Sequence, residues 1–94
     1  MAECLDATDT LVRLYGEAFG GKARGRYRIS AKLVRQLMRR RRLYDDDIRA
    51  LTRALVERGF ILVDMESFFV LLSANTFVNY RRANEECLLD KPAE

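Results

Sequence analysis

The spacing of apolar residues predicts a first helix over residues 9–19. Its apolar positions recur at intervals of three and four residues, which brings them to one face of an α-helix. These positions are Leu11, Leu14, Tyr15 and Ala18. Asp6 or Thr8 is placed to cap the start of this helix, and Gly20 with Gly21 is placed to end it.

The pattern changes over residues 24–29, where polar and apolar side chains alternate strictly. Such alternation predicts a short strand, with Tyr27 and Ile29 facing inward and arginines facing outward. The next residue, Ser30, is placed to cap a second helix, which we expect to end near Arg40. The buried stripe of that helix is predicted to comprise Leu33, Val34, Leu37 and Met38.

A third helix is predicted over residues 46–58, after a tight, arginine-rich turn. One aspartate of the run Asp45-Asp46-Asp47 is expected to cap this helix, and Gly59 is expected to end it. The buried face of the helix is predicted to contain Ile48, Leu51 and Leu55.

Two β-rich runs follow, at residues 60–63 and 68–72, and the polar turn between them predicts a hairpin. Both runs are apolar on both faces, so a further element is needed to cover the outer side. A fourth helix over residues 75–88 is predicted to supply that cover, whereas residues 1–5 and 90–94 are expected to fray. The inward face of the fourth helix is predicted to contain Phe77, Tyr80, Asn84 and Leu88.

The predicted order is helix, strand, helix, helix, hairpin and helix, in a single domain of residues 1–94 whose core spans about 9–89. This is an α+β fold, mostly helical. Over about residues 10–72, the order and lengths of the elements resemble a winged helix-turn-helix DNA-binding domain. The resemblance implies that the hairpin pairs with the short strand, and that helix 46–58 occupies the place of the DNA-reading helix.

Positive charge is concentrated in residues 22–42. This stretch holds ten of the chain's 17 basic residues and none of its 14 acidic residues, although the net charge of the chain is only +3. A concentrated positive surface attracts polyanions, and helical spacing predicts a continuous ridge through Lys32, Arg35, Arg39 and Arg42. The residues of this stretch predicted to contact nucleic acid are Arg24, Arg26, Arg28, Lys32, Arg35, Arg39, Arg40 and Arg42.

The third helix adds two further candidates, Arg49 and Arg53, on its predicted outer face. In the family that the chain resembles, this helix enters the major groove, where each arginine fits a guanine edge. The alternative is a self-neutralising ladder with Asp46 and Glu57. The aspartate run before the helix and the acidic hairpin tip depart from the family pattern, because both would repel phosphate.

Other classes of function find little support in the sequence. There is no histidine and no Cys-x-x-Cys, so we expect no metal site, no catalytic base and no cofactor or small-molecule ligand. Cys4 and Cys87 are expected to be free thiols. No apolar run is long enough to span a membrane and no signal segment opens the chain, so a cytoplasmic protein is expected.

We therefore expect a small, non-enzymatic protein that binds double-stranded DNA as a transcriptional regulator. A homodimer through the terminal helices is also expected, because two-fold proteins read palindromic sites. The apolar residues assigned to that interface are Phe77, Tyr80, Leu88, Leu11, Tyr15 and Phe19. The alternative is an interaction module, an adaptor or inhibitor, that docks its basic face on an acidic protein partner.

Overall fold

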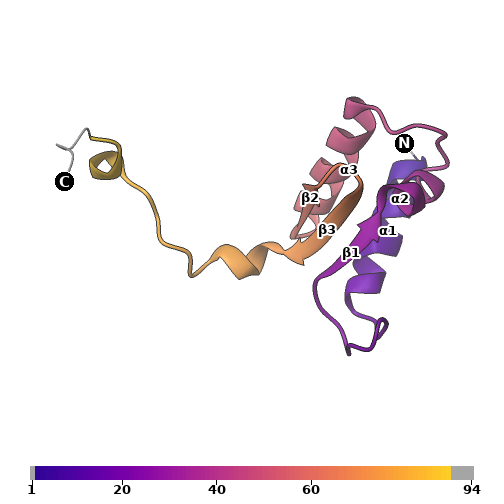
Figure 1. The fold of residues 1–94 in the computed structure, drawn as a ribbon, viewed down its shortest axis with the longest axis horizontal. Helices are drawn as coiled ribbons and strands as arrows, with labels where there is room; N and C mark the ends of the chain where they lie inside the picture. The colour runs from indigo at the N-terminus through magenta and orange to yellow at the C-terminus, as the bar shows by residue number, and fades with distance from the viewer. Residues whose placement is uncertain (1, 90–94) are drawn as a thin grey trace.

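The computed structural model describes residues 2–89, and the expected fraying of residues 90–94 lies outside this range. Three helices and three strands form the folded body (Figure 1). In chain order they are α1 (Ala2–Tyr15), β1 (Tyr27–Ser30), α2 (Ala31–Leu37), α3 (Asp45–Glu57), β2 (Phe60–Asp64) and β3 (Phe68–Ser73). Two short 3₁₀ turns follow, η1 (Ala74–Phe77) and η2 (Glu85–Leu88).

The strands form one antiparallel sheet in the order β1-β3-β2, so the predicted hairpin and its pairing with the short strand are confirmed. In this register Ile29 lies opposite Phe69, and Leu62 lies opposite Leu71. These four side chains are buried and face the helices. The α+β class predicted from the sequence is confirmed.

The core lies between the helices and the inner face of the sheet. Leu11 of α1, Leu51 and Leu55 of α3, and Phe69 and Leu71 of β3 are all almost completely buried. Burying a side chain of this size stabilises the fold by about 1.5–3 kcal/mol. Within residues 2–89, no helix is both long enough and apolar enough to cross a membrane.

The first helix is displaced from its predicted range of 9–19. It begins at Ala2, because Cys4 and Ala7 continue the buried face of Leu11 toward the N-terminus. Residues 2–5 therefore belong to α1, and the core begins before residue 9 with the buried Cys4. The thiol of Cys4 is free, as is that of Cys87, as expected.

The predicted caps of the first helix are also wrong. Asp6 and Thr8 lie inside α1, where the Thr8 hydroxyl donates to the carbonyl oxygen of Cys4 at 2.8 Å. The helix ends before Gly16, whose N–H donates to the carbonyl oxygen of Arg13 at 3.1 Å. The glycine pair expected to end the helix instead forms a separate turn further along the chain.

The second helix is shorter than expected. Ser30 caps it as predicted, because the Ser30 hydroxyl oxygen accepts a hydrogen bond from the Leu33 N–H at 3.2 Å. Leu33 itself is 49% exposed, so it does not belong to the buried stripe. The helix ends at Leu37 rather than near Arg40, and Arg39 has a φ of 57°, which a continuing right-handed helix does not allow.

The third helix agrees with its prediction to within one residue. Tyr44, rather than an aspartate, is the N-cap residue; Asp47 lies in the first turn, where its carboxylate accepts the backbone N–H of Tyr44 at 3.0 Å. Gly59 follows the end of the helix with a φ of 86°, a left-handed conformation that glycine adopts without strain. Leu51 and Leu55 are buried as expected, and Ile48 is partly buried.

The predicted fourth helix is absent. Residues 74–89, called the arm from here on, leave the end of β3 and extend away from the body (Figure 1). The radius of gyration is 16.6 Å, whereas a compact domain of this length has about 12 Å. The arm contains three asparagines, Asn75, Asn79 and Asn84, which disfavour a helix. Phe77, Tyr80 and Leu88 are consequently exposed rather than packed on the sheet.

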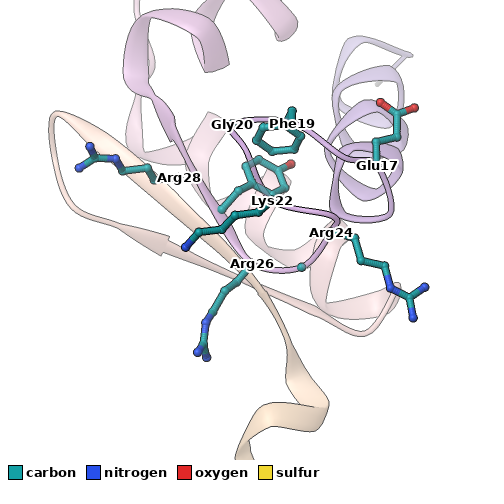
Figure 2. A pocket seen from close by; sticks show the side chains of 9 residues that line it. Glu17, Phe19, Gly20, Lys22, Arg24, Arg26 and Arg28 are labelled. Atoms are coloured by element: carbon teal, nitrogen blue, oxygen red, sulfur yellow. The ribbon is translucent and has the colours of Figure 1, made fainter.

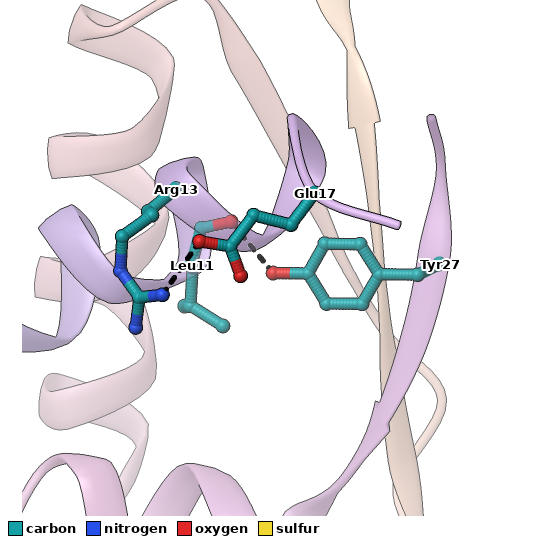
Figure 3. Close-up of polar contacts among 4 residues, drawn as sticks. All are labelled: Leu11, Arg13, Glu17 and Tyr27. Carbon is teal, nitrogen blue, oxygen red and sulfur yellow. Dashed lines mark hydrogen bonds and ion pairs between the residues drawn. The ribbon is translucent and has the colours of Figure 1, made fainter. Parts of the chain in front are cut away.

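Tyr27 connects β1 to α1. Its hydroxyl donates to the carbonyl oxygen of Leu11 at 2.7 Å (Figure 3), and burial raises the pKa of this hydroxyl above its ordinary value. We expect Tyr27→Phe to lower the free energy of unfolding by about 0.5–1.5 kcal/mol near neutral pH, because the hydrogen bond is lost.

The raised pKa of Tyr27 also fixes how this difference depends on pH. Stability from the protonated hydroxyl is fully present below about pH 10 and is lost as the pH rises above that value, where the unfolded state ionises first. The stability difference between the wild type and Tyr27→Phe should therefore shrink in urea unfolding above about pH 10. A difference that stayed constant would contradict the assignment.

Candidate nucleic-acid interface

Four basic residues before and within β1 gather around one hollow of the surface. They are Lys22, Arg24, Arg26 and Arg28, called the α1–β1 cluster from here on. The hollow has a volume of about 500 Å³, and Phe19 and Tyr27 contribute its aromatic part (Figure 2). Glu17 is its one acidic lining residue, and its carboxylate already pairs with Arg13 at 2.8 Å (Figure 3). Positive charge therefore dominates this hollow.

Backbone geometry explains why this loop presents its cations together. Gly20 and Gly21 have φ values of 60° and 82°, and they form a turn closed by hydrogen bonds between Phe19 and Lys22. The Phe19 ring packs edge-on against Tyr27, with ring centroids 5.3 Å apart. The glycine turn and the ring contact hold the loop against β1, so the basic side chains extend outward (Figure 2).

A second group of arginines lies between α2 and α3. It consists of Arg39, Arg40, Arg41 and Arg42, called the α2–α3 cluster from here on. All four are exposed, but Arg40 reaches the buried carboxylate of Asp47 at 3.5 Å. The Arg42 guanidinium lies over the Tyr44 ring at 5.9 Å. These contacts hold the cluster at the N-terminal end of α3.

The hairpin tip faces this second cluster. Arg35, Arg41 and Arg42 share a hollow of about 290 Å³ with Asp64 and Glu66. The acidic residues at the tip therefore lie close to arginines and offset part of their charge. This surface is of mixed sign, unlike the α1–β1 cluster.

The outer face of α3 is a shallow groove with a volume of about 390 Å³. Ala50 and Ala54 line it together with the charged residues, of which Arg49 and Arg53 are exposed. Arg49 pairs weakly with Asp46 at 3.4 Å. Arg53 forms no ion pair within residues 2–89. Only the Asp46–Arg49 half of the expected ladder is therefore present in the described chain.

The predicted basic ridge does not run along one continuous helix. Lys32 and Arg35 lie on α2, but the helix ends at Leu37, and the backbone of Arg39 turns left-handed. The α1–β1 loop and the α2–α3 loop lie at opposite ends of the body (Figure 1). The sequence correctly located the basic residues, but it joined two separate surfaces into one.

Two basic residues outside the predicted set belong to these surfaces. Lys22 lines the hollow of the α1–β1 cluster, and Arg41 lines the hollow beside the hairpin tip. Both lie inside the basic stretch 22–42, and membership of this stretch is the sequence feature that could have identified them. In a helix that continued past Leu37, Arg41 would lie on the apolar side. Because α2 ends at Leu37, helical spacing no longer determines where Arg41 lies.

No protein-family model, curated protein or solved structure matches the chain significantly.

Proposed function

We propose that this protein is a small, non-enzymatic DNA-binding protein of the winged helix-turn-helix type that regulates transcription. The observation that carries the proposal is the outer face of α3. It exposes Arg49 and Arg53 beside two alanines, next to the arginines of the α2–α3 cluster. The element order and the strand order β1-β3-β2 support the same assignment.

The dimensions of α3 suit the major groove. A helix of 13 residues is about 20 Å long, and the groove of B-DNA is about 12 Å wide. Arg49 and Arg53 lie one helical turn apart, and the small alanines between them allow a close approach to base edges. A guanidinium forms two hydrogen bonds with the O6 and N7 atoms of guanine, so these residues are proposed to read sequence.

Charge at the start of α3 is less unfavourable to phosphate than the aspartate run suggests. Asp47 is only 6% exposed, and its carboxylate is occupied by the Tyr44 N–H and by Arg40. Asp46 faces Arg49. The flanking Arg39, Arg41 and Arg42 remain at the surface and are proposed to contact phosphates on either side of the groove.

A second candidate function is the docking of an acidic protein. The α1–β1 cluster favours it, because this cluster lies at the other end of the body from the N-terminus of α3 (Figure 1). Its aromatic residues Phe19 and Tyr27 provide apolar contact area between the cations. An adaptor or inhibitor that binds through this end needs no DNA.

Binding to duplexes of varied sequence tests the DNA proposal. Fluorescence anisotropy should show binding of the wild-type protein, and a selected duplex should bind more tightly than a random one. Replacing Arg53 with alanine should cost about 1–3 kcal/mol on the selected duplex and little on the random one, because one base-reading pair is lost. The absence of binding to any duplex would reject the proposal and favour the acidic protein partner.

A further inference from the structure

The outer face of the sheet is apolar, and its side chains are only partly buried. Ile61 and Val63 of β2 lie opposite Leu72 and Val70 of β3, and all four point away from the helices, since their neighbours point toward the core. Within residues 2–89, none of the four belongs to the core or packs against it. Phe68 lies on the same face, below the Arg28 guanidinium at 5.7 Å. An apolar face of this kind marks an interaction site.

The arm is a second apolar surface, and it extends away from the rest of the described chain. Its exposed apolar residues are Phe77, Val78, Tyr80, Leu88 and Leu89. The Phe77 and Tyr80 rings pack edge-on against each other, with centroids 5.1 Å apart, and within residues 2–89 they form no ring pair with the body. One chain therefore carries a partly buried apolar sheet face and a separate, exposed apolar segment.

Hydrogen bonds at the base of the arm fix the direction in which it leaves the body. The Ala74 N–H donates to the carbonyl oxygen of Gly59 at 2.9 Å, and the Asn75 N–H donates to the Ser73 hydroxyl oxygen at 3.2 Å. These bonds start η1, which points away from the sheet (Figure 1). The first residues of the arm are therefore directed away from their own sheet.

We propose that the arm of each chain covers the outer sheet face of a second copy, so that two chains exchange arms in a two-fold dimer. Two-fold symmetry forms each arm-to-sheet contact twice from the same residues. This inference deepens the proposed function by supplying the homodimer that a palindromic site requires. It replaces the expected interface between terminal helices, since the last helix is absent and Leu11 is fully buried.

Charge complementarity supports this occupant. Arg28 lies on the outer face of β1, and Arg26 precedes it on the same side (Figure 2). The arm carries an exposed basic pair, Arg81 and Arg82, after its aromatic residues, and the exposed acidic pair Glu85 and Glu86 follows at the start of η2. The acidic end of one arm is therefore proposed to meet the basic edge of the partner sheet, while the aromatic part covers the apolar centre.

The mass of the full chain in solution tests the proposal. Sedimentation equilibrium at micromolar concentration should give twice the chain mass of 10.9 kDa. Val70→Glu, in the outer face, and the pair Phe77→Ser with Tyr80→Ser, in the arm, should each return the monomer mass. Leu5→Ser removes an exposed leucine of α1, which belongs to neither surface, and should leave the dimer intact. A monomeric wild type, or a dimer that these variants do not weaken, would overturn the proposal.

Reversing the sign of residues that are already charged tests whether the arm meets the sheet edge of the partner. No new charge is added to the apolar face. Arg26→Glu with Arg28→Glu should weaken the dimer, because acidic sheet edges then meet acidic arms. Glu85→Arg with Glu86→Arg should weaken the dimer as well, because a basic arm then meets a basic sheet edge. Mixing the two weakened proteins should restore a dimer, since each arm then meets a sheet edge of opposite charge. If the mixture stays monomeric while both variants retain the wild-type circular dichroism, the arm does not dock at this edge.

These outcomes are independent of the DNA proposal. A chain that dimerises through its arms and binds no duplex would retain this inference and lose the proposed function. A monomer that binds a single half-site through α3 would retain the proposed function and lose this inference.

Discussion

Replacing Arg39 and Arg41 with alanine should weaken binding to every duplex about equally, by roughly 60-fold at 0.1 M salt. The estimate assumes one phosphate contact for each arginine, and each contact changes the slope of log affinity against log salt by about 0.9. The slope should therefore fall by about 1.8. Neither side chain forms an ion pair or a ring contact within residues 2–89, so the folded state should keep its stability.

A matched variant controls for the loss of two positive charges. Lys22→Ala with Arg24→Ala removes the same charge from the α1–β1 cluster, and both side chains are equally exposed. If DNA approaches α3, this pair should leave the salt slope nearly unchanged. Should the control lose more affinity than the test pair, the duplex binds at the α1–β1 end and α3 is not the reading helix.

The central part of the fold was predictable because its signals are local. Strict alternation indicated β1, the Ser30 hydroxyl indicated the start of α2, and Gly59 indicated the end of α3. Each rests on a hydrogen bond or a dihedral angle within a few residues. The hairpin followed from two apolar runs of strand length, and its pairing with β1 followed from the resemblance.

The two ends of the chain were not predictable in the same way. The N-terminal helix starts earlier because Cys4 and Ala7 continue the buried face of Leu11, and such small side chains give only a weak apolar signal in the sequence. The arm was assigned to a helix because the apolar sheet needed a cover. That reasoning assumed that the cover comes from the same chain, whereas the arm extends away from the body with its apolar residues exposed, and the outer sheet face is only partly buried.

In the candidate site, too, one property was predictable from the sequence and another was not. All ten predicted basic residues lie at least partly at the surface, as their charge requires. Their grouping depends on one backbone conformation, the positive φ of Arg39, which ends α2 and turns the chain toward α3. Arginine is not a residue that signals a left-handed conformation, so the sequence favoured a continuous ridge.

The orientation of α3 decides whether Arg49 and Arg53 can reach DNA, and a pair of adjacent leucine and valine substitutions tests it. Leu55 is 0% exposed in the core, whereas its neighbour Val56 is 51% exposed. Leu55→Ala should lower the free energy of unfolding by about 2–5 kcal/mol, because it removes buried contacts and leaves a cavity. Val56→Ala should change it by less than about 0.5 kcal/mol.

The expected loss at Leu55 is large compared with the stability of the whole chain. A domain of this length is stable by about 5–14 kcal/mol, so urea unfolding of Leu55→Ala should show a clearly lower midpoint with a similar slope. If Val56→Ala were the more damaging variant, α3 would be rotated about its axis, because adjacent residues lie about 100° apart on a helix. Arg49 and Arg53 would then turn from the outer groove toward the body, and the proposal that α3 reads DNA would fail with them.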